Sequence, residues 1–290
     1  MAQERPLGAF GGLIIVAFVF VAIFADLLAT HAYDGLDFDN MLAGPSGAHL
    51  LGTDQLGRDL LSRIIFGARV SIYVVLGAVS LQTALTLFLG VVPVWYGGRW
   101  DTWTQRLLVD TWITLPRLLI LLSLSTLLGP SILTMMLILS LGGFSSSRII
   151  RGVVLTLKET PFVDAARAIG VSTPRLLMRH IVPNTFAPLM VLATLDVGSV
   201  ILAESSLSFL GYGIPPPFPS WGRMLGGDAL DFYEEAPWLM LWPGLVLTSV
   251  IFGANVFGDA LRDMLDPRMR GAGRAKAAGA RSLRRGKATR

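Results

Sequence analysis

The 290-residue chain is 53% hydrophobic and only 15% charged, whereas soluble domains carry about 25% charged residues, so an ordinary soluble domain is excluded. The formal net charge of +4 arises entirely after Asp266, where nine Lys and Arg occur with no acid; residues 1–267 hold 15 basic and 20 acidic side chains. Cysteine is absent, which excludes disulfides, Cys nucleophiles and Cys-based metal sites. The three histidines, His31, His49 and His180, are scattered, and we predict no metal site from them.

Six apolar segments are long enough to cross a membrane, whose hydrocarbon core of ~30 Å takes roughly 20 helical residues. We place them at about 8–29, 70–94, 106–128, 131–150, 185–204 and 237–259. The first is expected to remain as an anchor, because no small-x-small cleavage site follows it. Pro116 and Pro243 are expected to kink the third and sixth segments. The pattern predicts an all-α polytopic membrane protein with six transmembrane helices.

The distribution of charge predicts the orientation of these helices. If both termini are cytoplasmic, most basic residues fall in the segments on the cytoplasmic side of the membrane. The two long loops at about 30–69 and 205–236 then lie on the other side, and they hold nine acids. By the positive-inside rule these two loops are external. We therefore expect a multi-pass membrane protein with both termini in the cytoplasm. The basic tail, residues 268–290, is expected to be disordered and to lie near anionic lipid rather than to bind nucleic acid.

The segment 151–184, between the fourth and fifth spans, carries the start and stop signals of two short helices. Thr160 suits an N-cap and Pro161 the first helical position. Gly170 suits the left-handed residue that ends a helix. Thr173-Pro174 repeats the start signal, and Pro183 is expected to end the second helix. The prediction is a helix, a glycine corner and a second helix that leads into the fifth span.

The first of these short helices carries an apolar stripe. Phe162, Ala165, Ala166 and Ile169 follow the i, i+3, i+4, i+7 spacing of one helix face. The stripe is suited to docking in the groove of another protein, or to lying against the chain's own membrane helices. The pattern alone leaves both possibilities open.

Five motifs in order resemble one family of membrane proteins. Asp164-Ala165-Ala166, Gly170 and Ile181-Val182-Pro183 resemble the EAA motif of ABC importer permeases, with Asp in place of the usual Glu. The other four resemble the C-type permease of the dipeptide and oligopeptide (nickel) importers; they are Leu51–Arg63 with Gly67–Ser71, Glu204–Gly213, Pro215–Gly222 and Gly258–Arg268.

This resemblance implies a type I importer permease (MetI-like) fold in the bacterial cytoplasmic (inner) membrane. It also implies a second homologous permease, two ATPase subunits and an extracytoplasmic binding protein. It implies that the short helix couples to the ATPase through Pro161, Phe162, Asp164, Ala165, Ala166, Arg167, Ile169, Gly170 and Pro183. This chain itself is not expected to be an enzyme or to bind a cofactor. Its only Gly-Lys pair, Gly286-Lys287, lacks the first glycine and the last hydroxyl of a phosphate-binding loop. ATP and Mg would bind the partner subunits.

Asp110, Asp196 and Glu204 lie in or at the edges of spans, where ionisable residues avoid lipid. They are expected either to line the pathway or to contact the second permease. The external loop from Asp34 to Arg69 could contact the binding protein or brace the permease pair. Aromatic residues near span ends predict an interfacial belt made of Trp95, Tyr96, Trp100, Trp103, Trp112, Trp238 and Trp242.

Three domains are expected: an anchor and external loop (1–69), a permease core (70–267) and the tail (268–290). The predicted function is one half of the translocation pathway for di- and oligopeptides. A nickel or glutathione-type importer of the same family is the alternative. An ion-driven secondary transporter is a more distant rival, because no internal repeat is evident. A non-transporting scaffold or receptor is a third possibility.

Overall fold

A computed structural model describes residues 6–265, and within them the chain is helical with no β-strand. The long helices are α1 (Pro6–Ile23), α3 (Leu60–Tyr96), α8 (Gly143–Lys158), α11 (Val182–Phe209) and α14 (Trp238–Leu265). The short α-helices are α2 (Ala25–Leu28), α4 (Gly98–Trp103), α5 (Thr111–Thr114), α6 (Arg117–Leu128), α7 (Ile132–Ser140), α9 (Pro161–Ala168), α10 (Thr173–Leu176), α12 (Trp221–Leu225) and α13 (Asp228–Asp231). Phe38–Asn40 forms a 3₁₀ turn (η1), and Thr104–Asp110 (η2) and Leu177–Ile181 (η3) are π-helical.

Five continuous helical segments among the described residues are long and apolar enough to cross a membrane: Pro6–Ile23, Leu60–Tyr96, Ile132–Lys158, Thr173–Phe209 and Trp238–Met264. A sixth span exists if Gly98–Thr114 and Arg117–Leu128 are counted together. This confirms the predicted all-α fold, and the six predicted spans correspond to five continuous helical segments and one bent pair. The predicted basic tail lies outside the described residues.

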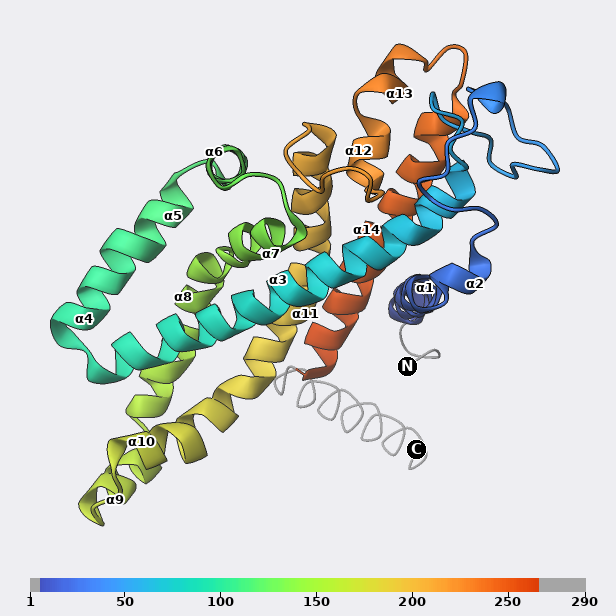
Figure 1. Ribbon diagram of the computed structural model, residues 1–290. Coiled ribbons are helices and arrows are strands. Elements are labelled where there is room, and N and C mark those ends of the chain that lie inside the picture. Colours follow the sequence, from blue (N-terminus) through green and yellow to red (C-terminus); the bar gives the residue numbers. More distant parts are fainter. Residues whose placement is uncertain (1–5, 266–290) are drawn as a thin grey trace, which may run out of the picture.

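The third predicted span is not a continuous helix with a mild kink. Its two halves meet at 98°. Leu115 is extended, with ψ 144°, because a residue before proline is sterically driven out of the helical region. Pro116 therefore breaks this span, and α6 continues in a different direction from α5 (Figure 1).

The second span is longer than predicted and crosses the expected domain division at residue 69. α3 has 37 residues, which corresponds to about 55 Å. The sequence placed its start near residue 70 because Arg63 and Arg69 interrupt the apolar run. Both arginines are paired within the chain: Arg63 donates to the Tyr33 carbonyl at 3.0 Å, and Arg69 lies 2.8 Å from a carboxylate oxygen of Asp26.

α3 is the central element of the bundle (Figure 1). It packs against α1, α7, α8 and α11, while α14 packs against α1 and α11. The contact between α1 and α14 is close: a Cβ added to Gly11 would lie 2.8 Å from the Gly253 carbonyl oxygen. Small residues let membrane helices approach in this way.

The two predicted external loops pack on each other at one end of α3. Trp221 donates its indole N–H to the Ile64 carbonyl at 3.0 Å, and Trp238 donates to the Thr53 carbonyl at 3.2 Å. α9 and α10 lie toward the opposite end of α3 (Figure 1). The bundle thus holds the external loops and the short helices α9 and α10 apart.

Candidate functional site

The predicted helix–glycine–helix segment forms, and its first helix begins as expected. Thr160 is extended (φ −83°, ψ 143°) at the N-cap position and Pro161 occupies the first turn of α9. The Thr160 hydroxyl does not cap the helix, however. It donates to the Leu157 carbonyl of the preceding helix, so its hydrogen bond links α8 to the start of α9.

Gly170 ends α9 in the left-handed conformation that the sequence predicts, with φ +78°. The Gly170 N–H donates to the Arg167 carbonyl at 3.0 Å, and the Val171 N–H donates to the Ala166 carbonyl at 3.0 Å. This pair of bonds is the Schellman arrangement, which satisfies the last carbonyls of a helix. No atom lies within 4 Å of an added Cβ at Gly170, so glycine serves the backbone angle and not a close contact.

Most of the apolar stripe on α9 is exposed, and only Ala166 packs against the chain's own buried cluster. Val163 is completely buried in a cluster with residues of α3, α8, α10 and α11, and it anchors the helix. By contrast, Ile169 is 81% exposed and Phe162 41% exposed, while Ala165 is exposed and Ala166 half-buried. Of the two possibilities left open by the sequence, the structure favours a stripe presented outward.

Trp95 joins α9 to the end of α3. Its ring is buried, and the Arg167 guanidinium carbon lies 5.2 Å and the Lys158 amine 5.8 Å from the ring centre, which are cation–π distances. Lys158 also donates to the Trp95 carbonyl at 2.9 Å, placing a cation at the negative end of α3. The expectation that Trp95 belongs to an interfacial belt is therefore wrong: it lies inside the protein beneath α9.

The second short helix does not end at Pro183. α10 continues through the π-helical η3 into α11, and Pro183 lies in the first turn of α11. The backbone hydrogen-bond pattern changes here from π-helical to α-helical. Pro183, which has no N–H to donate, therefore does not interrupt a regular series of α-helical hydrogen bonds on its N-terminal side. The chain therefore runs without a break from α10 through η3 into the membrane-spanning helix α11.

The acids in the spans have partners within the chain. Arg148 of α8 pairs with Asp110, and Arg151 binds Asp101 through two bonds, of 3.0 and 2.6 Å. These ion pairs connect the segment 98–114 to α8. The Asp196 carboxylate lies 3.4 Å from the Ser146 hydroxyl.

Glu204 is only 1% exposed, so its carboxylate is enclosed by this chain alone. The roles expected for it in the pathway or at the second permease stay predictions. It accepts hydrogen bonds from the hydroxyls of Ser208 (2.7 Å), Ser220 (3.0 Å) and Ser205 (3.3 Å). The Ile214 N–H in turn donates to Ser208. The carboxylate therefore holds together the end of α11 and the loop that follows it.

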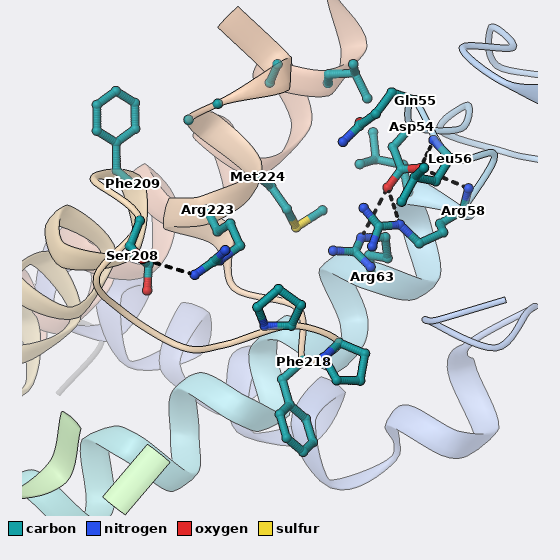
Figure 2. Close-up of a pocket in the computed structure, with 18 of the residues that line it drawn as sticks. Asp54, Gln55, Leu56, Arg58, Arg63, Ser208, Phe209, Phe218, Arg223 and Met224 are labelled. Carbon is teal, nitrogen blue, oxygen red and sulfur yellow. Dashed lines mark hydrogen bonds and ion pairs between the residues drawn. The ribbon is translucent and has the colours of Figure 1, made fainter. Parts of the chain in front are cut away.

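A cavity of about 530 Å³ opens between the two predicted external loops (Figure 2). Its walls carry Arg58, Arg63 and Arg223 together with Asp54, which lies 2.7 Å from Arg58. Burial lowers the pKa of the Arg223 guanidinium. The sequence did not reveal this basic cavity, because its walls come from segments about 150 residues apart.

Comparison with known proteins identifies the class to which this architecture belongs. Residues 82–271 match the family described as binding-protein-dependent transport system inner membrane component, and the chain belongs to this family. Residues 4–45 match the N-terminal transmembrane domain of oligopeptide transport permease C. The resemblance drawn from the motifs, including the type I importer permease fold, is thereby confirmed.

Similar proteins cover most of the chain. The dipeptide transport system permease protein of Alkalihalophilus pseudofirmus is 38% identical over 92% of this chain and 88% of its own length. The oligopeptide transport system permease protein of Bacillus subtilis is 38% identical over 92% and 88%. A glutathione transport system permease protein of Escherichia coli is 36% identical over 93% and 89%.

Proposed function

We propose that this chain is one of two permease subunits that form the peptide pathway of an ATP-driven importer, and that α9 is the helix on which an ATPase subunit acts. The observation that carries the proposal is the placement of α9. It is anchored by Val163 and leaves Phe162, Ala165 and Ile169 exposed. The helix lies at the end of the bundle opposite the external loops (Figure 1). An exposed apolar stripe with two alanines is suited to a close-fitting groove.

The substrate class is proposed from the relatives. Those named for dipeptides, oligopeptides and glutathione share a cargo built of peptide units. We therefore favour a peptide over a nickel complex.

The partners follow from the family. A second homologous permease would complete the pathway, an extracytoplasmic protein would deliver peptide at the external loops, and two ATPase subunits would bind ATP and Mg. Closure of the ATPase pair would move α9 and, through Trp95 and η3, the ends of α3 and α11. Coupling of this kind requires that ATP bind the inward-open and outward-open states unequally.

The coupling residues Pro161, Asp164, Ala166, Arg167, Gly170 and Pro183 have distinct parts in this proposal. Pro161 and Gly170 fix the two ends of α9. Asp164 and Arg167, whose charged atoms lie 3.6 Å apart, border the stripe. Pro183 lies in the first turn of α11, where the segment of α10 and η3 joins it.

Site-specific cross-linking tests the proposal, because the chain contains no cysteine. Ala165→Cys should cross-link to an ATPase subunit in the assembled transporter, and Ser46→Cys, in the external loop, should not. In intact cells a membrane-impermeant maleimide should label the cysteine at 46 and spare the one at 165. Labelling of 165 from outside would place α9 on the wrong side and end the proposal.

Uptake measurements test the coupling directly. Ala165→Arg puts a long cation into the stripe and should abolish peptide uptake while the protein still inserts in the membrane. Ala165→Ser is the matched control and should keep uptake, because it adds one oxygen atom. Normal uptake in Ala165→Arg would contradict the assignment of α9.

A further inference from the structure

Three side chains of metal-ligating type meet where the external loop joins α3. The Nδ1 atom of His49 lies 3.0 Å from Oδ1 of Asp59, and Nδ1 of His31 lies 3.7 Å from the same oxygen. The two imidazole rings are 4.8 Å apart, and the three ligand atoms all lie within 4.8 Å of one another. Although the histidines are scattered in the sequence, the fold brings two of the three together.

The carboxylate of Asp59 is fixed so that one oxygen faces the histidines. Its Oδ2 accepts the Ser62 N–H at 2.8 Å and the Ser62 hydroxyl at 2.7 Å, which leaves Oδ1 directed to the imidazoles. This fixed orientation leaves Oδ1 within 3.7 Å of the Nδ1 atoms of both imidazoles.

The two histidines differ in how far they are buried. His49 is 8% exposed, whereas the His31 side chain is 43% exposed. The position of His31 is nevertheless defined, because its backbone N–H donates to the Ser62 hydroxyl at 3.0 Å and its Nδ1 lies 3.0 Å from the Thr30 hydroxyl. The cluster is thus closed on the protein side and open to solvent beside His31.

We propose that His31, His49 and Asp59 bind a first-row divalent metal ion, with zinc the best match. Two imidazole nitrogens and one carboxylate oxygen form a common three-ligand zinc set, and a water completes the tetrahedron on the open side. Calcium and magnesium prefer oxygen ligands only. Bonds of about 2.0–2.1 Å in a tetrahedron separate neighbouring ligand atoms by about 3.3 Å, and the two distances to Asp59 Oδ1 lie on either side of that value. The largest separation among the three ligand atoms is 4.8 Å, so binding requires the exposed imidazole of His31 to turn inward and close the set.

Such an ion would clamp the external loop to the start of α3. His31 and His49 lie in the loop, while Asp59 is the N-cap of α3 and also pairs by a β-bridge with Thr53, whose carbonyl binds Trp238. The ion would therefore stabilise the external end of the molecule. This inference does not depend on α9 or on the cargo.

Metal titration of the full chain in nanodiscs, after chelator treatment, tests the site. Calorimetry with zinc chloride should show one ion per chain, and zinc should raise the thermal unfolding midpoint. Cobalt should give the visible absorption bands of a tetrahedral site with nitrogen and oxygen ligands. His49→Gln and Asp59→Asn should each weaken zinc binding by at least about tenfold.

His180→Asn is the matched control, because His180 lies at the opposite end of α3 and its loss should leave zinc binding unchanged. His31→Ala carries the test if the buried variants do not fold, since His31 is partly exposed and lies outside the hydrophobic core. Absence of a stoichiometric site, or equal zinc affinity in His31→Ala and the unmodified chain, would overturn the proposal. The three residues would then form a cluster in which His49 is hydrogen-bonded to Asp59 and His31 to Thr30.

Discussion

Val163 is the side chain whose truncation should most cleanly detach α9 from the bundle. It is completely buried, whereas Ile169 on the same helix is 81% exposed. Val163→Ala removes two carbons from the cluster, worth about 0.8 kcal/mol each in transfer free energy. The cavity left behind adds to this, for a total of about 2 kcal/mol. That change corresponds to roughly a 30-fold rise in the population of detached α9.

Hydrogen exchange measured by mass spectrometry on peptides covering residues 160–171 gives the readout. Amides of α9 should exchange about 30-fold faster in Val163→Ala than in the unmodified chain. Ile169→Ala should leave this protection unchanged, yet weaken attachment of the ATPase subunit. Equal protection in the Val163→Ala variant would refute the anchoring role of Val163, and faster exchange in Ile169→Ala would show that the stripe packs on its own chain.

Three further predictions concern other positions. Gly170→Val should strain the left-handed residue by about 1–2 kcal/mol or more and uncouple peptide uptake from ATP hydrolysis; equal uptake per ATP in this variant would count against the glycine corner. Glu204→Ala leaves buried serine hydroxyls without an acceptor, at about 1–3 kcal/mol each, and should lower the thermal unfolding midpoint in detergent more than Glu204→Gln does. Gly11→Val should push α1 from α14 and reduce the yield of folded protein, whereas Gly47→Ala, with no atom within 4 Å of the added Cβ, should not; similar yields would contradict the packing.

The helical content and most spans could be predicted because hydrophobic length is a property of local sequence. The two main differences between the predicted and observed spans arose where contacts with distant residues decide how a residue affects the helix. Arg63 and Arg69 interrupt the apolar run in the sequence, but the carbonyls of Tyr33 and Ala22 and the carboxylate of Asp26 satisfy them, so α3 begins at Leu60. Pro116 predicted a kink, but only the structure gives the 98° change of direction.

The short helix α9 and its glycine corner were predicted because caps and a four-residue stripe act locally. The residues that pack beneath α9 were not predicted. Trp95 has the sequence context of an interfacial aromatic, and its place under Arg167 depends on the return of α8 to the end of α3. The His31–His49–Asp59 cluster was also missed, since ligands 10 and 28 residues apart in a loop have no periodic signature.

α3 runs from Leu60 to Tyr96 as one helix, with its only proline, Pro93, in the last turn, and it therefore connects the two ends of the bundle directly. One tip meets Trp221 and the loop that ends at Asp59, and the other meets Lys158. For a rod of about 55 Å, a rotation of about 5° around its midpoint displaces each tip by about 2.4 Å in opposite directions. A displacement of one end of α3 would thus move the other end directly, without a chain of side-chain contacts between the two ends.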